Sequence, residues 1–336
     1  MSETPSETAR ETLKQAFLDT TPWAQAERWM IAGDASNRKY DRLRMGDDTA
    51  ILMDAPPEKG EDVAPFVAVA DYLAGLGLSA PKILARDMAR GFLLLEDLGD
   101  DLFARVAVAD PALETPMYRA AIDALIALHR ADPMPGLAAY DAGVMTPLAA
   151  LAYDWYLAES LGARPDARAE FCTAMEPLLA DHAATDVTIL RDYHAENLLW
   201  LPHREGAARV GLLDFQDAML GDAAYDLVSL LMDARRDVPP ALADEMIGYY
   251  TQAYGLDRAK FETRYHVVGA QRNLRILGVF ARLSRRDGKK HYVDLIPRVW
   301  DHLMVNLAHP ALAPVAALIK RDLPAPDAQI LDRLRR

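Results

Sequence analysis

The sequence predicts an α+β protein with two lobes, one small and mainly antiparallel β with a helix, the other larger and mainly helical. Through residues 1–98, strand-like and helical stretches follow in the order β-β-β-α-β-β after a first helix. Through residues 99–336, apolar residues recur at helical spacing, except in one hairpin. A chain of 336 residues is long enough for two such lobes. We therefore expect an N-terminal lobe over 1–98 and a C-terminal lobe over 99–336.

The composition excludes several classes of partner. A net charge of -13 and a pI near 5.1 argue against nucleic acid and anionic membranes, which favour basic surfaces. The hydrophobic content of 51% and the mean hydropathy of -0.07 indicate a soluble globular protein, and no apolar run reaches the length of a membrane span. The first residues are polar and acidic, unlike a signal peptide, and the single Cys172 cannot form an internal disulfide. We expect a cytoplasmic monomer.

The N-terminal lobe begins with a helix whose inward residues are expected to be Leu13, Ala16 and Phe17. Three strands follow at about 27–31, 39–45 and 49–54, and two more at about 82–85 and 92–95. The helix between these two groups, over about 62–76, has an apolar face at helical spacing. The residues of that face are Val63, Phe66, Val69, Ala70 and Leu73.

A short turn of small and polar residues, 32–38, separates the first two strands. It ends in Ser36, Asn37 and Arg38. Such a turn can offer backbone N–H groups and an Arg to nucleotide phosphates. It lacks the G-x-G-x-x-G pattern, and an ordinary hairpin loop would have the same residues.

The C-terminal lobe reads as helices at about 115–130, 146–161, 165 onward, 222–231 and 271–283. Asp226, in the first turns of its helix, is expected to support a neighbouring loop through hydrogen bonds. The last of these helices is unusually polar at Gln271, Arg272, Asn273 and Arg275. This face is either solvated or the wall of a substrate pocket.

The stretch from Leu190 to Asp217 contains the chemically informative residues. Asp192 and Asn197 are five residues apart, and Asp214 follows the apolar run Val210–Leu213. An acid, an amide and a second acid can activate a hydroxyl and hold Mg²⁺ beside phosphates. A polar loop would explain the first two residues equally well. The runs 197–201 and 210–213, however, predict a hairpin that brings Asn197 and Asp214 together at one end.

These residues have the order of the protein-kinase patterns H-R-D-x-x-x-x-N and D-F-G, with Leu190 in place of the His and Gln216 in place of the Gly. A kinase also has a Lys on its third strand, where this chain has Met53. We expect Arg42, together with Arg38, to supply the missing positive charge, with Arg44 the next candidate. Solvated strand arginines are the alternative.

The run Leu93–Gly99 reads as an apolar strand that meets a turn. In a kinase this segment is the hinge between the lobes. Adenine would be bound there by the Glu96 carbonyl and the Leu98 N–H. The residues 1–98 would then form a nucleotide-binding lobe, and 99–336 a catalytic and substrate-binding lobe.

Most of the chain, about 31–300, resembles the aminoglycoside phosphotransferase/choline-kinase group of protein-kinase-like enzymes. The resemblance rests on the pieces A-G-D-A-S-N-R-K-Y, M-D-A-P-P-E, L-L-L-E-D-L-G-D, R-D-Y-H-A-E-N-L-L-W, D-F-Q-D-A and Y-D-L-V-S-L-L. Within the group, D-F-Q-D-A, Q-R-N-L-R-I-L-G-V-F-A-R-L and D-G-K-K-H-Y are similar to the kinases of cell-wall recycling. Those enzymes phosphorylate N-acetylmuramate and N-acetylglucosamine on the anomeric hydroxyl. The group also has a non-Lys residue at the position of Met53.

The resemblance implies a protein-kinase-like fold, ATP as co-substrate and Mg²⁺. It implies that Asp192 is the catalytic base and that Asn197 and Asp214 hold the metal. Asp217 would lie near the metal or the acceptor. Arg272 or Arg275 would pair with the lactyl carboxylate of N-acetylmuramate. His194 and Glu196 would contact the acceptor or, as we favour, stabilise the loop.

Two other functions fit the sequence. One is a kinase of the same fold for an aminoglycoside, choline or an amino alcohol, which would need an acidic cluster or an aromatic cage for a cationic acceptor. The other is a nucleotide-binding regulator without turnover, suggested by the missing Lys and His. The joint presence of Asp192, Asn197 and Asp214 argues against the regulator.

Overall fold

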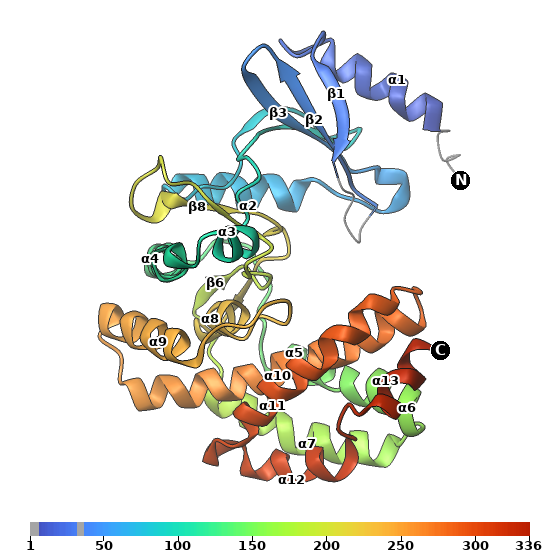
Figure 1. Ribbon diagram of the computed structural model, residues 1–336, viewed down its shortest axis with the longest axis vertical. Helices are drawn as coiled ribbons and strands as arrows, with labels where there is room; N and C mark the ends of the chain where they lie inside the picture. Colours follow the sequence, from blue (N-terminus) through green and yellow to red (C-terminus); the bar gives the residue numbers. More distant parts are fainter. Residues whose placement is uncertain (1–6, 32–36) are drawn as a thin grey trace. The chain divides into compact units, whose positions relative to one another are not determined.

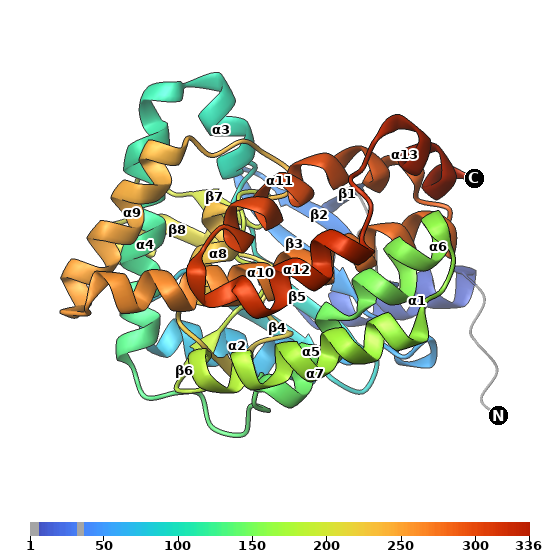
Figure 2. The same cartoon turned by 90° about the horizontal axis from the view of Figure 1, so that it is seen from below.

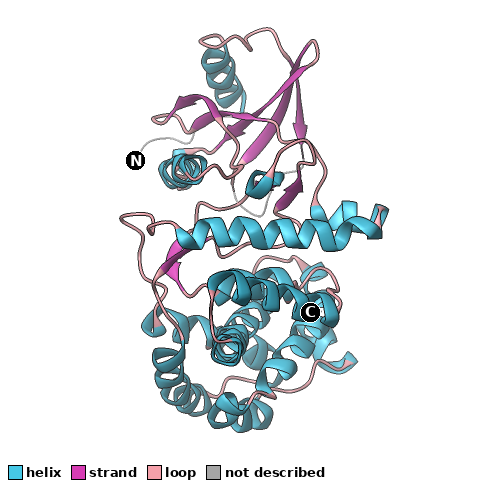
Figure 3. Ribbon diagram, turned by 90° about the vertical axis from the view of Figure 1, so that its left-hand side faces the viewer, coloured by secondary structure: helices cyan, strands magenta, loops and turns pink. Residues whose placement is uncertain are grey.

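In the computed structural model, which describes residues 7–31 and 37–336, the chain forms two compact units. Unit 1 comprises Met1–Ala109 and Asn197–Asp217, and unit 2 comprises Asp110–Glu196 and Ala218–Arg336. The prediction divided the chain once, after residue 98. Unit 1 runs on to Ala109 and also contains a later segment, Asn197–Asp217. The long strands belong to unit 1, and unit 2 is almost entirely helical (Figure 1, Figure 3), which confirms the α+β class.

Among the described residues, no single helix is both long and apolar enough to cross a bilayer. Two consecutive helical segments, Lys290–Leu307 and Pro310–Asp322, together have the length and composition of a membrane span. The chain bends by 99° between them. In this pair, the apolar residues Val299, Leu303 and Ile319 are buried within the protein.

Unit 1 is built on a five-stranded sheet with the order β1-β2-β3-β5-β4, in which every neighbouring pair is antiparallel. The inner strands β3 and β5 have nearly continuous apolar runs, as expected where both faces are covered. The strands and the helix after the third strand confirm the predicted order. Their bounds are β1 Glu27–Ile31, β2 Lys39–Met45, β3 Asp48–Asp54, α2 Ala64–Gly75, β4 Ile83–Asp87 and β5 Phe92–Glu96.

The first helix, α1 (Glu7–Leu18), covers one face of this sheet. Phe17 and Leu18 share a buried cluster with Leu43 of β2 and Leu52 of β3. Ala16, which we expected to face inward, is exposed. The inward face instead carries Lys14, Phe17 and Leu18, which lie at i, i+3 and i+4.

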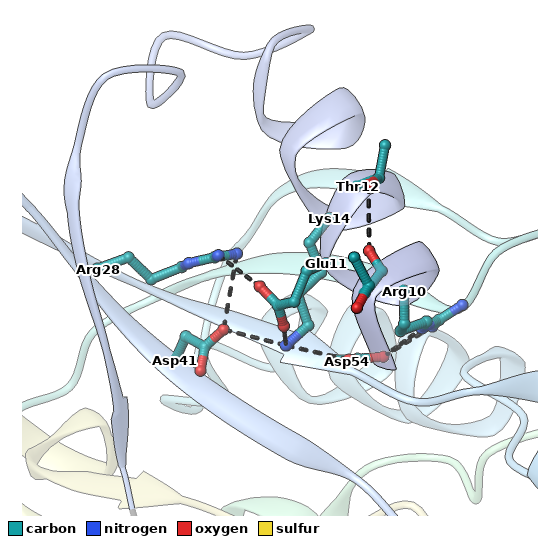
Figure 4. A network of polar contacts seen from close by, with 8 residues as sticks. Arg10, Glu11, Thr12, Lys14, Arg28, Asp41 and Asp54 are labelled. Atoms are coloured by element: carbon teal, nitrogen blue, oxygen red, sulfur yellow. Dashed lines mark hydrogen bonds and ion pairs between the residues drawn. The ribbon is translucent and has the colours of Figure 1, made fainter. Parts of the chain in front are cut away.

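Buried ion pairs attach α1 to the sheet, as Figure 4 shows. The Lys14 ammonium lies 3.2 Å from a carboxylate oxygen of Asp41 and 3.2 Å from one of Asp54. The Arg10 guanidinium donates to the same Asp54 carboxylate at 2.7 Å. Because buried charges are tolerated only when paired, these residues form one structural network.

The predicted hairpin is present in unit 1 and is confirmed. β7 (Leu198–Trp200) pairs antiparallel with β8 (Val210–Leu212) in the register Leu198 opposite Leu212. Trp200 of β7 packs edge-on against Phe103 of α3 (Phe103–Ala109). The hairpin is therefore anchored by contacts within unit 1.

Unit 2 is organised around the 28-residue helix α10 (Arg258–Arg285), which packs against α5, α8 and α11 (Figure 2). At Gly278 a side chain could not fit, because a Cβ there would lie 2.2 Å from the backbone carbon of Leu151. Leu151 opens a π-helical turn, Ala152–Leu157. The remaining elements are α4 Glu114–Arg130, α5 Ala142–Ala149, α6 Ala158–Leu161, α7 Pro165–His182, β6 Val187–Ile189, β9 Met219–Gly221, α8 Ala224–Leu231, α9 Pro240–Tyr254, α11 Ile296–Leu307, α12 Ala313–Asp322 and α13 Ala328–Arg335.

Candidate active site

The end of the hairpin in unit 1 brings two predicted metal ligands together. Asn197 precedes β7 and Asp214 follows β8, and the Leu213 N–H donates to the Asn197 carbonyl at 3.0 Å. The Asn197 Nδ2 lies 3.5 Å from Oδ2 of Asp214. The predicted convergence of Asn197 and Asp214 is therefore confirmed.

Asp214 has two features typical of a functional position. Its φ is +56°, a left-handed conformation that is rare for a residue with a side chain. The Gln216 Nε2 donates to its Oδ1 at 2.6 Å. The residue that replaces the Gly of D-F-G thus holds the carboxylate of Asp214.

The residues at this end of the hairpin fit Mg²⁺. They offer carboxylate and amide oxygens, the ligands that Mg²⁺ prefers, and an Asn side chain can turn its oxygen toward a cation. No group of three or more His, Cys, Asp or Glu arranged for a metal occurs in the described part of the chain. Beside nucleotide phosphates, Mg²⁺ usually takes only one or two protein carboxylates, and phosphate and water complete its shell.

Phe215 connects Asp214 to the helix α2. Its ring lies 4.8 Å from the ring of Phe66, measured between centroids, and Phe215 is fully buried. Asp214 is therefore fixed on one side by a core contact and on the other by the amide of Gln216.

The loop that carries Asp192 belongs to unit 2 and is held through its backbone. The buried carboxylate of Asp226, in α8, accepts hydrogen bonds from the N–H groups of Leu190 at 2.7 Å and Arg191 at 2.8 Å. Arg191 has a φ of +70°. The Arg191 carbonyl accepts from Ser229 Oγ at 3.2 Å. The supporting role predicted for Asp226 is confirmed.

Charges around Asp226 compensate only partly for its burial. Burial raises the pKa of Asp226 to about 6, while its backbone hydrogen bonds and then Arg272 lower it. Arg272, at 4% exposure, donates from Nη2 to Ser229 Oγ at 2.7 Å. Arg272 thus joins the group of residues that supports the loop.

Arg275, one turn further along α10, lies among the side chains next to Asp192. Tyr225, ahead of Tyr140 and Asp192, raises the pKa of the Arg275 guanidinium. The guanidinium of Arg191 stands over the ring of Tyr140, 5.2 Å from its centroid. Asp192 therefore lies in a part of unit 2 that is rich in arginine and tyrosine.

Of the remaining predicted acceptor contacts, His194 is buried. Burial, followed by Arg235, lowers the pKa of His194 to about 4, and Arg235 Nη1 lies 3.3 Å from its Nε2. Asp233 accepts from the Ala195 N–H at 3.2 Å, next to His194. This supports loop stabilisation by His194. Glu196 and Asp217 are exposed.

The predicted ATP contacts lie in unit 1. Ser36 falls outside the described residues. The Asn37 N–H and the Arg38 Nε both donate to the Glu61 carboxylate, at 3.0 Å and 2.9 Å. Arg42 is bound by two acids that follow β5, Nε to Asp97 at 2.8 Å and Nη1 to Asp100 at 2.7 Å.

The segment predicted to be a hinge begins in β5 and runs on to Gly99. Glu96 accepts from Arg204 Nη2 at 2.7 Å through its side chain, and its N–H donates to the Lys82 carbonyl at 2.8 Å. Adenine binding by the backbone of Glu96 and Leu98 stays a prediction.

Sequence reasoning missed several residues that hold the site. Each of them has a polar side chain that contacts a residue distant in the sequence. A sequence signal exists for two of them, Asp97 and Asp100, which are spaced acids directly after a buried strand. They are Glu61, Asp97, Asp100, Tyr140, Tyr225, Ser229 and Asp233.

Residues 30–261 match the phosphotransferase enzyme family. The chain belongs to this family. It is 43% identical to an N-acetylmuramate/N-acetylglucosamine kinase of Caulobacter vibrioides, over 94% of this chain and 97% of that one. It is 35% identical to a protein of the same name from Pseudomonas aeruginosa, over 88% of each chain.

Two solved structures share the fold. A choline kinase from Streptococcus pneumoniae superposes with a TM-score of 0.60 at 13% identity, over 89% of this chain and 100% of that one. An aminoglycoside-3'-phosphotransferase of type VIII superposes with a TM-score of 0.53 at 17% identity, over 77% and 97%. These similarities confirm the predicted protein-kinase-like fold and the resemblance to this group.

Proposed function

We propose that this protein is an ATP-dependent kinase that transfers the γ-phosphoryl group to the anomeric hydroxyl of N-acetylmuramate and N-acetylglucosamine. The observation that carries the proposal is the 43% identity, over nearly the full length of both chains, to a kinase named for these sugars. The product would be a sugar 1-phosphate of peptidoglycan recycling. A cytoplasmic monomer remains our prediction.

Asp192 is the proposed catalytic base. Its carboxylate accepts the proton of the 1-hydroxyl as the sugar oxygen attacks the γ-phosphorus. A new O–P bond forms, and the bond from that phosphorus to the β–γ bridging oxygen breaks, so that ADP leaves. The C1–O bond of the sugar stays intact, and the product keeps the configuration of the anomer.

Asn197 and Asp214 are the proposed Mg²⁺ ligands, supported by their convergence at the end of the hairpin. When bound, Mg²⁺ supplies positive charge that neutralises the phosphate oxygens. The contribution of the protein is to hold a carboxylate at a fixed place and orientation, here through Gln216 and Phe215.

Arg275 is the proposed partner of the lactyl carboxylate of N-acetylmuramate. Arg272 donates to Ser229 and is almost fully buried, whereas Arg275 has intermediate exposure and lies near Asp192. A guanidinium can bind a carboxylate in bidentate fashion. N-acetylglucosamine lacks this carboxylate, so the two sugars separate this contact from the rest of the site.

An ATP-consumption assay with both sugars tests the proposal. Wild type is compared with Asp192→Asn and Arg275→Met. We expect turnover of both sugars by wild type and a loss of about 10³-fold or more in kcat for Asp192→Asn. For Arg275→Met we expect a loss of about tenfold or more in kcat/KM for N-acetylmuramate alone.

Three outcomes would contradict these assignments. Absence of sugar-dependent turnover in wild type would sink the sugar kinase, and turnover of an aminoglycoside, choline or an amino alcohol instead would favour the alternative acceptors. Nucleotide binding without any turnover would favour the regulator. Full activity of Asp192→Asn would remove Asp192 as the base.

A further inference from the structure

The loop between α8 and α9 is attached to the loop of Asp192, and both belong to unit 2. Asp233, at 1% exposure, accepts one hydrogen bond at each carboxylate oxygen. The Ala195 N–H donates to its Oδ2 at 3.2 Å, and the Arg235 N–H donates to its Oδ1 at 2.8 Å. Between these residues and the base, the His194 N–H donates to the Asp192 carbonyl at 3.2 Å. One buried carboxylate therefore fixes the backbone of Arg235 to the loop of Asp192.

The side chain of Arg235 is held at the same loop. Its Nη1 lies 3.3 Å from Nε2 of the buried His194. A guanidinium can only donate, so Nε2 is the acceptor in this hydrogen bond and the imidazole is neutral. Burial, followed by Arg235, lowers the pKa of His194 to about 4, which agrees with a neutral imidazole near pH 7. Arg235, although exposed, is thus anchored through both its backbone and its side chain.

The charge of the Arg235 guanidinium is not compensated by an acid among the described residues. Its neighbours differ in this respect. Arg236 forms an ion pair with Glu114, and Arg298 of α11 binds Asp237 through two contacts at 2.7 Å and 3.1 Å. A guanidinium that is held by a neutral group keeps its full charge for an anion and can bind phosphate oxygens in bidentate fashion.

The arginines of α10 near Asp192 are placed differently. Arg272 is 4% exposed and donates to Ser229 within the support of the loop. Arg275 lies beside Tyr225 and is the proposed partner of the lactyl carboxylate. Neither of them is attached to the loop between α8 and α9.

The proposed reaction creates an anion next to Asp192. The sugar oxygen that gives its proton to this carboxylate receives the phosphoryl group, so the phosphate of the product lies beside it. Two neighbouring negative groups need a cation that is already in place. We propose that Arg235, oriented by His194 and Asp233, binds the phosphoryl group as it joins the sugar and in the sugar 1-phosphate. This inference rests on the proposed kinase function.

Binding of the product without nucleotide tests the contact. Calorimetry measures the affinity of N-acetylglucosamine 1-phosphate, as both anomers, and of N-acetylglucosamine for wild type, Arg235→Met and Arg235→Lys. Arg298→Met is the matched control, because Arg298 contacts the same loop at the Ala234 carbonyl. Steady-state kinetics give kcat and the KM for the sugar, and thermal unfolding verifies that each variant is folded.

We expect Arg235→Met to bind the sugar 1-phosphate about tenfold or more weakly and to bind the free sugar as wild type does. The kcat should fall by a similar factor with little change in the KM for the sugar, since the guanidinium contacts the phosphoryl group alone. Arg235→Lys keeps the charge without the planar fork and should retain part of the affinity. Arg298→Met should behave as wild type.

Two results would overturn the role of Arg235 in an active enzyme. One is an unchanged affinity of Arg235→Met for the sugar 1-phosphate. The other is an equal loss of affinity for the free sugar, which would show that Arg235 only stabilises the loop. A wild type that phosphorylates neither sugar would refute the proposed function and this inference with it.

Discussion

The two loops that carry the proposed chemistry hold their backbone strain in different ways. Among the described residues other than glycine, only Arg191 in unit 2 and Asp214 in unit 1 have a positive φ, +70° and +56°. Such a conformation costs about 1–3 kcal/mol and persists only where the surroundings enforce it. The surroundings of the two residues are of different kinds.

At Asp214 the surrounding groups bind the side chain. Gln216 donates to one carboxylate oxygen and Asn197 lies near the other. At Arg191 they bind the backbone, since Asp226 accepts from two successive N–H groups and Ser229 donates to the carbonyl. The proposed metal ligand thus keeps partners that can exchange for a cation, whereas the loop of the proposed base has a fixed backbone.

The largest effect is expected from Arg272→Met. This substitution removes the positive charge next to Asp226 and Ser229, the two side chains that hold the backbone of Arg191. Arg272 binds Ser229 and lowers the pKa of the buried Asp226. We expect a decrease of about 2–4 kcal/mol in the free energy of unfolding, because Asp226 loses its compensating charge. We also expect a lower kcat with little change in the KM for ATP. Urea denaturation and steady-state kinetics measure both.

The matched control is Arg285→Met, at the end of the same helix, where the arginine pairs with Glu159 near the surface. It should change the free energy of unfolding by no more than about 1 kcal/mol. Equal stability losses in both variants would show that the buried group has no special role in holding the loop.

The next effect is a pH dependence of the free energy of unfolding. It should arise from Asp226, which holds the loop in unit 2. The native carboxyl of Asp226 has a pKa of about 6, above the value of about 3.9 in an unfolded chain. Between these values the native state binds more protons, so stability falls as the pH rises from about 4 to about 6. The contribution of Asp226 to this fall is up to about 3 kcal/mol.

Unfolding free energies of wild type and Asp226→Asn, measured from pH 4.5 to 7.5, isolate this contribution. The side chain of the variant does not titrate, so stability should fall less with rising pH than in wild type. Parallel curves for the two proteins would contradict a raised pKa of Asp226.

Local patterns predicted much of this structure. Alternation and apolar runs predicted the strands of unit 1 and the hairpin, because each depends on residues close in sequence. The period of two placed Tyr40, Arg42 and Arg44 on one face, and the register agrees. The acids after β5 carry a local signal, but their pairing with Arg42 was not predictable, since Asp97 lies 55 residues from Arg42 and their contact depends on the folded sheet.

The same limit applies to the site. The spacing of Asp192, Asn197 and Asp214 is the basis of the proposed chemistry, and the hairpin predicted the contact of Asn197 with Asp214. Nothing in the sequence indicated that Arg191 would be left-handed, a conformation usually adopted by glycine. The helical period also failed for Ala16, because the buried ion pairs of Lys14 rotate α1 toward the sheet.

The smallest effect is expected from Gln216→Met, which tests the side-chain support of Asp214. The substitution keeps the length of the side chain and removes the amide that donates to Oδ1 at 2.6 Å. One hydrogen bond on a half-buried group contributes about 1 kcal/mol, so stability should change little. The carboxylate is then less well oriented, and the Mg²⁺ concentration for half-maximal activity should rise roughly threefold to tenfold. Titration of Mg²⁺ at saturating ATP measures this, with Gln216→Asn, whose amide is one methylene shorter, as a partial rescue. A Mg²⁺ requirement identical to that of wild type would show that Asp214 needs no side-chain support, and the contrast with the loop of Arg191 would then lie in the backbone alone.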